Sequence, residues 1–99
     1  MSKNFDDLLS KLKGIQRKKL AVAVAQDEPV LEAVKEANDK GIADAILVGN
    51  KEEISLIAKN IGMDLNKFEI VNIEEPKKAT LHAVELVSIG RADMLMKGL

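Results

Sequence analysis

The chain has 99 residues, no cysteine and a formal net charge of -1, from 15 basic and 16 acidic side chains. Because the two signs are interleaved and the only aromatic residues are Phe5 and Phe68, the sequence argues against nucleic acid as a partner. The length predicts one domain, residues 1–99, and the absence of a signal peptide or membrane-spanning run predicts a cytoplasmic protein without membrane contact.

Apolar spacing alternates between helical and extended segments along the chain. Residues 4–14 predict a short amphipathic helix, and the continuous apolar run 20–25 predicts a strand covered on both faces. A helix is expected over 27–41, a second strand over 43–49 and a second crossover helix over 51–62. A half-buried or edge strand follows over 67–72, then a helix over 75–90 and a fourth strand over 93–97.

Strands that alternate with helices of this length predict an α/β fold with an open, three-layer parallel sheet. The expected spatial order of the strands is 3-2-1-4, so the topology reverses between the first and fourth strands. Open sheets bind ligands at the carboxyl edge beside such a reversal. The crevice is therefore expected between Gln26-Asp27 and Lys97-Gly98.

Four residues are candidates for binding a substrate at that edge. Lys97 ends the fourth strand and would offer an ammonium to an anion, and Gly98 would let a ligand approach the backbone. Gln26 and Asn72 end the first and third strands and would offer neutral hydrogen-bonding groups. The ordinary alternatives stay open: a solvated lysine before a turn glycine for Lys97-Gly98, and helix capping for Asp27 and Asn72.

Other chemistries lack their residues. The turn Ala25-Gln26-Asp27-Glu28-Pro29 has no Gly-x-Gly-x-x-Gly pattern, which argues against dinucleotide binding. With one histidine and no cysteine, neither a metal site nor a nucleophilic catalytic set is expected. His82 lies in mid-helix and is expected on the helix surface, and the basic run 17–19 is expected to be solvated. The sequence holds no complete catalytic constellation.

Three phrases in the right order resemble the amino-terminal part of the phosphate acetyl/butyryltransferase family, closer to its butyryl than its acetyl branch. They are KLAVAVAQDEPVLEAV at 19–34, GIADAILVG at 41–49 and GRADMLMKGL at 90–99.

The resemblance implies that the chain is the opening segment of a longer, two-domain enzyme with an isocitrate/isopropylmalate dehydrogenase-like fold. The implied reaction moves a short acyl group, butyryl, between coenzyme A and inorganic phosphate, with the coenzyme A thioester as substrate and no covalently bound cofactor. The phrase around Lys97 matches the family stretch that enters the cleft between the domains. We expect the isolated chain to be inactive and to form a homo-oligomer through its fourth strand. A non-catalytic flavodoxin-like interaction module is the alternative.

Overall fold

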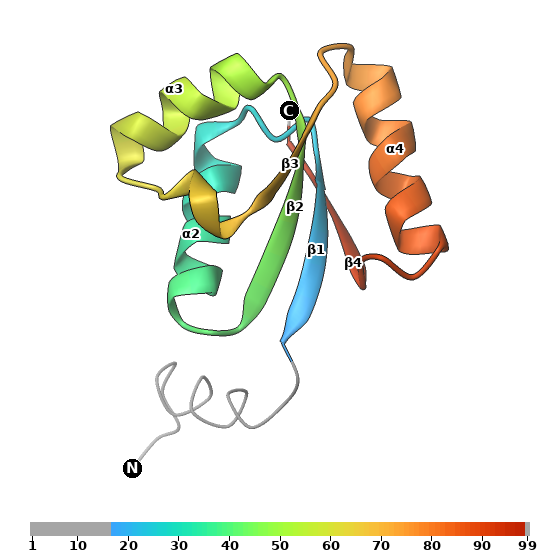
Figure 1. Ribbon diagram of the computed structural model, residues 1–99, viewed down its shortest axis with the longest axis horizontal. Helices are drawn as coiled ribbons and strands as arrows, with labels where there is room; N and C mark the ends of the chain where they lie inside the picture. The colour runs from blue at the N-terminus through green and yellow to red at the C-terminus, as the bar shows by residue number, and fades with distance from the viewer. Residues whose placement is uncertain (1–16, 99) are drawn as a thin grey trace.

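The computed structural model describes residues 17–98 (Figure 1). The helix predicted over 4–14 lies outside these residues. The elements alternate between strand and helix as predicted, and they are β1 (Lys18–Ala23), α2 (Glu28–Asp39), β2 (Ala43–Gly49), α3 (Lys51–Ile61), the short 3₁₀ helix η1 (Leu65–Lys67), β3 (Glu69–Asn72), α4 (Pro76–Ser88) and β4 (Met94–Lys97).

The four strands form one parallel sheet in the order β3-β2-β1-β4, which confirms the predicted order. Helices α2 and α3 cover one face of the sheet and α4 covers the other, giving three layers (Figure 1). All three helices begin at the carboxyl edge, where the strands end. Within residues 17–98, no helix is long and apolar enough to cross a membrane.

The burial of both faces of the central strands explains why their sequences are continuously apolar. Side chains along a strand point alternately to opposite faces, and both faces of β1 and β2 are covered. Leu20, Val22 and Leu47 pack against α2 and α3, whereas Ala21 and Ile46 pack against α4. An apolar side chain is therefore buried at every position from Leu20 to Ala23 and from Ala45 to Val48.

Several predicted boundaries were wrong by one or two residues. The first strand was expected over 20–25, but it begins at Lys18, whose N–H donates to the Ile42 carbonyl, and it ends at Ala23 because Val24 turns to a φ of 51°. The third strand begins at Glu69 rather than at residue 67, because η1 takes the chain up to Lys67. The helices expected over 27–41 and 75–90 are shorter at both ends.

Candidate functional site

Lys97 lies at the carboxyl end of β4, on the face of the sheet that α4 covers. Its register partner Ala23 packs in the core beneath α4, and paired residues of neighbouring strands share a face. Lys97 is exposed and lines an open, mainly apolar groove of about 550 Å³. The other lining residues come from the end of β1 and the first turns of α4: Val24, Pro76, Lys77, Thr80 and Leu81.

Gly98 is buried where the end of β4 meets the turn after β1. Its N–H donates to the Ala23 carbonyl at 2.7 Å, which extends the pairing of β4 with β1. A Cβ at this position would overlap the Val24 carbonyl and would lie 3.1 Å from the Asp27 Cβ. The glycine is thus needed for backbone packing, and its N–H already has an acceptor. A role in binding a ligand stays a prediction.

Gln26 and Asn72 both hold the amino terminus of α3. The Gln26 Oε1 accepts from the Asn50 N–H at 3.1 Å, and the Asn72 Oδ1 accepts from the Lys51 N–H at 3.0 Å. Asn50 completes the arrangement, since its Oδ1 accepts from the Glu53 N–H at 3.1 Å. N–H groups in the first turn of a helix lack acceptors within the helix. The capping role considered for Asn72 is therefore what the structure shows.

The four predicted site residues divide into two groups. Lys97 and Gly98 lie with Val24, whereas Gln26 and Asn72 lie at the start of α3. Three strand spacings separate β3 from β4, about 14 Å, so Asn72 and Lys97 cannot touch the same small ligand directly. Within residues 17–98, the Lys97 ammonium and the Gln26 Nε2 group make no hydrogen bond or ion pair, so this edge still offers donors suited to an anion.

Val24 is a feature of the site that sequence reasoning missed. Its φ of 51° is a left-handed conformation that a β-branched residue rarely adopts, yet its side chain is buried. Such a conformation costs about 1–3 kcal/mol and persists only where the surrounding structure enforces it. No sequence signal could have found it, because a valine within an apolar run indicates an extended strand.

The remaining polar candidates have structural roles or lie elsewhere. Asp27 caps α2 by accepting from the Val30 N–H at 3.1 Å. His82 is partly exposed on α4, with its Nδ1 3.9 Å from the Glu85 carboxylate. Arg91 pairs with Glu69 at 3.3 Å near the amino ends of β4 and β3, so it lies at the opposite edge from Lys97.

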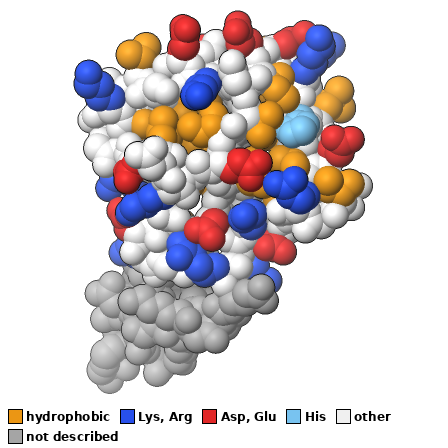
Figure 2. Space-filling view, in the orientation of Figure 1, with side chains coloured by type: hydrophobic (Ala, Val, Ile, Leu, Met, Phe, Trp, Pro, Cys, Tyr) orange, Lys and Arg blue, Asp and Glu red, His pale blue; other side chains and the backbone are white. Residues whose placement is uncertain are grey.

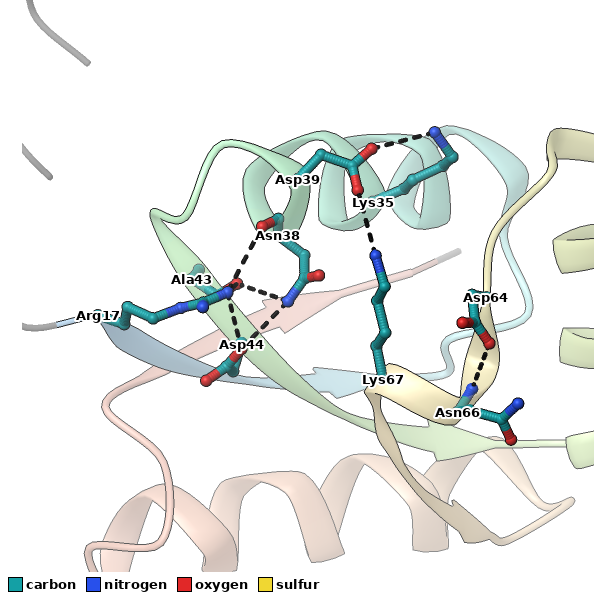
Figure 3. A network of polar contacts seen from close by, with 9 residues as sticks. All are labelled: Arg17, Lys35, Asn38, Asp39, Ala43, Asp44, Asp64, Asn66 and Lys67. Atoms are coloured by element: carbon teal, nitrogen blue, oxygen red, sulfur yellow. Dashed lines mark hydrogen bonds and ion pairs between the residues drawn. The ribbon is translucent and has the colours of Figure 1, made fainter. Parts of the chain in front are cut away.

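The amino edge of the sheet carries a polar network around the end of α2 (Figure 3). The Arg17 guanidinium lies 3.0 Å from the Asp44 carboxylate, and the Asn38 Nδ2 donates to the same carboxylate at 3.1 Å. Lys35 and Lys67 approach Asp39 from two sides. The first residue of the basic run 17–19 thus has an acidic partner, and the network ties the start of β2 to α2.

Charged side chains of both signs are intermixed over the face shown in Figure 2. Residues 17–98 contain no group of three or more His, Asp or Glu side chains that could hold a metal ion. Within residues 17–98, the donors at the carboxyl edge could therefore bind an anion, whereas no cluster of acidic side chains is arranged to bind a metal ion.

The sequence matches known proteins along its whole length. Residues 4–81 match the family model described as phosphate acetyl/butaryl transferase. The chain is 68% identical over all 99 residues to a phosphate butyryltransferase of Clostridium beijerinckii, and 64% identical to one of Clostridium acetobutylicum. A phosphate acetyltransferase of Thermotoga maritima is 41% identical over 81 residues. The chain spans 33% of the length of each Clostridium relative.

The fold is also that of solved phosphotransacetylases. The EutD phosphotransacetylase from Staphylococcus aureus superposes with a TM-score of 0.74 at 21% identity, over 94% of this chain and 37% of that one. A phosphotransacetylase from Streptococcus pyogenes gives the same TM-score at 18% identity, over 96% of this chain and 38% of the other. The strand order of this chain agrees with the sequence match. The chain belongs to the phosphate acetyl/butaryl transferase family.

Proposed function

We propose that this chain is the amino-terminal segment of an enzyme that transfers a butyryl group between coenzyme A and inorganic phosphate. The observation that carries the proposal is the 68% identity, across the whole chain, to a phosphate butyryltransferase. The two Clostridium relatives, at 68% and 64%, are both phosphate butyryltransferases, which favours butyryl as the acyl group. Residues 1–99 would form one α/β domain of a two-domain protein, acting in the cytoplasm on small-molecule substrates.

The reaction would join a phosphate oxygen to the thioester carbonyl carbon and break the carbon–sulfur bond. The products are butyryl phosphate and the coenzyme A thiol. The departing thiolate takes up the proton that hydrogen phosphate loses. Such a step needs cationic groups that hold the phosphate and donors for the developing oxyanion. No metal or bound cofactor is required by this balance.

In this segment, Lys97 is the residue best placed to hold the phosphate. Its ammonium is exposed at the carboxyl edge, lines the groove beside Val24, and has no acidic partner within residues 17–98. Gly98 would fix the position of Lys97 through its bond to Ala23 rather than donate to the ligand. Gln26 would contribute its Nε2 group, because its Oε1 already holds α3, and Asn72 would act only at a distance through α3. The remaining donors would come from the other two-thirds of the enzyme.

The test uses a composite chain, in which residues 1–99 replace the matching first third of the Clostridium beijerinckii relative. We expect the composite chain to form butyryl phosphate from butyryl-CoA and phosphate, and to form acetyl phosphate from acetyl-CoA more slowly. The 99-residue chain alone, and the remaining two-thirds alone, should form neither. Acyl phosphate is trapped with hydroxylamine and quantified in each case.

A Lys97→Ala variant of the composite chain tests whether Lys97 binds phosphate or only affects the overall activity of the enzyme. Loss of one charge-assisted contact, worth about 1.5–3 kcal/mol, should raise the KM for phosphate by about tenfold or more. Lys59→Ala, in the exposed last turn of α3, is the matched control and should change nothing. A folded but inactive composite chain, or an active 99-residue chain, would refute the proposal; an unchanged KM would remove Lys97 from it.

A further inference from the structure

Exposed apolar side chains gather on one side of the molecule. Within residues 17–98, all the large hydrophobic side chains with high exposure except one lie on α4, on β4 or between them: Leu81, Val84, Ile89, Met94 and Leu95. The exception is Leu56 on α3. Leu81 is 70% exposed and Leu95 45% exposed. Soluble proteins rarely leave contiguous apolar surface of this kind uncovered.

Of these residues, Leu81, Val84 and Leu95 lie on the α4 side of the sheet, whereas Met94 pairs with Leu20 and lies on the opposite face. The register partner of Leu95 is Ala21, which is buried beneath α4, so Leu95 lies on the same face of the sheet as that helix. Helix α4 packs mainly over β1 and β2, with Ala79 and Ala83 toward the sheet. Leu81 and Val84 are three positions apart and share a side of α4. We call the hollow between α4 and β4, including the groove lined by Val24, Thr80, Leu81 and Lys97, the α4–β4 groove.

The topology indicates what covers the α4–β4 groove. Helices α2 and α3 connect strands in one direction along the sheet and lie on one face, whereas α4 connects β3 to β4 in the other direction and lies on the opposite face. This arrangement arises when all crossovers have the same handedness. About 98% of such parallel units have right-handed crossovers. A crossover that leaves β4 and continues away from β1 must therefore place its helix on the face of α4, over β4.

We propose that the apolar part of the α4–β4 groove, between Leu81 and Leu95, is the docking site for the helix that follows Leu99 in the full-length protein, as the crossover to a strand paired with the free edge of β4. The end of the groove at Lys97 would stay open to the substrate at the carboxyl edge. The inference rests on the proposed function, under which about two-thirds of the protein lies beyond this segment. β4 pairs with β1 alone among the described strands, so its other edge is open. The chain leaves β4 at Lys97, which itself lines the groove, so the next segment begins beside its site.

The test measures the accessibility of single cysteines placed inside and outside the groove. Leu81→Cys and Leu95→Cys report on the groove, and Leu56→Cys, at a position 68% exposed on α3, is the matched control. Each is made in the 99-residue chain and in the composite chain, and the alkylation rate is read by mass spectrometry on the peptide that carries the substitution. We expect positions 81 and 95 to react about tenfold or more slowly in the composite chain, and position 56 to react equally in both.

Two results would overturn the proposal. One is alkylation of positions 81 and 95 in the composite chain as fast as in the 99-residue chain. The other is protection in the composite chain that appears only as protein concentration rises, because a second copy would then be the occupant. Denaturation midpoints show whether each variant is folded, and Leu81 and Leu95 supply two independent sites. The hydroxylamine assay is run on the same samples, so protection without activity refutes the proposed function alone, and activity without protection refutes the docking site alone.

Discussion

The two central strands and the two outer strands of this sheet differ in what covers them. β1 and β2 are buried over most of their length between α2 and α3 on one face and α4 on the other, whereas no residue of β3 or β4 is fully buried. Glu69 and Asn72 at the two ends of β3 suit an edge strand, but β4 exposes Met94 and Leu95. The comparison shows that the fully buried side chains of the sheet lie on the central pair, and that β4 carries apolar side chains without the cover that an interior strand has.

The largest expected difference is between leucines of a central and an outer strand. Leu47 on β2 is 0% exposed, so Leu47→Ala should lower the free energy of unfolding by about 2–5 kcal/mol, from lost burial and the cavity left behind. Leu95→Ala on β4 should cost less than about 1 kcal/mol in the 99-residue chain, because its side chain is half exposed. Urea denaturation of the two variants measures both values.

The same pair of substitutions in the composite chain sharpens the comparison. In the composite chain, the docked helix should cover Leu95. The loss of unfolding free energy caused by Leu95→Ala should then rise toward the loss caused by Leu47→Ala. Equal costs in the 99-residue chain would show that β4 is already as well packed as β2, and would contradict the contrast between central and outer strands.

A smaller difference is expected between the glycines that end β2 and follow β4. A Cβ at Gly49 would overlap the Gln26 Oε1 and would lie 2.9 Å from the Ala25 backbone nitrogen. Gly49→Ala should therefore destabilise the fold by about 1–3 kcal/mol through overpacking. Gly98→Ala meets the Val24 carbonyl, yet it should cost less in the 99-residue chain, because the end of β4 can move away. Thermal denaturation compares the two, and an equal loss would show that the end of β4 is held as firmly as β2.

The smallest expected effect concerns the polar contact between the outer elements. Arg91 and Glu69 join the turn before β4 to the start of β3 at 3.3 Å, and both side chains are about half exposed. Exposed pairs of this kind contribute about 0.2–1 kcal/mol and weaken in salt. Arg91→Ala should stay within that range at low salt and should have no effect at high salt. A larger, salt-independent loss would mean that the outer strands depend on Arg91 for more than charge.

Much of the fold could be predicted from the sequence, because the apolar period changes between strands and helices and the handedness rule leaves few topologies. The run from Leu20 to Ala25 indicated a strand buried on both faces, and β1 and β2 have that environment. The early end of β1 could not be predicted, since it depends on Val24 adopting a conformation that its residue type disfavours. That turn is imposed by tertiary packing rather than by local preference.

The residues of the candidate site lie at the predicted edge of the sheet, but their contacts there were not predicted, and their role in binding stays a prediction. Parallel strand order was enough to bring Gln26, Asn72 and Lys97 to one edge of the sheet. Which partner each side chain takes depends on distances between elements, and sequence spacing does not contain them. Gln26 and Asn72 meet the free N–H groups of α3, whereas Lys97 meets none of these groups and faces the α4–β4 groove.

The contact between Gly98 and Val24 has a mechanical consequence. Because the bare Cα of Gly98 lies close to the Val24 carbonyl and to Asp27, the end of β4 can move outward from β1 but cannot move closer to the loop that starts α2. A displacement of the end of β4 toward β1 would therefore press on the turn at Val24 and on Asp27, which caps α2. Two segments that are remote in sequence thereby limit each other's movement in one direction only.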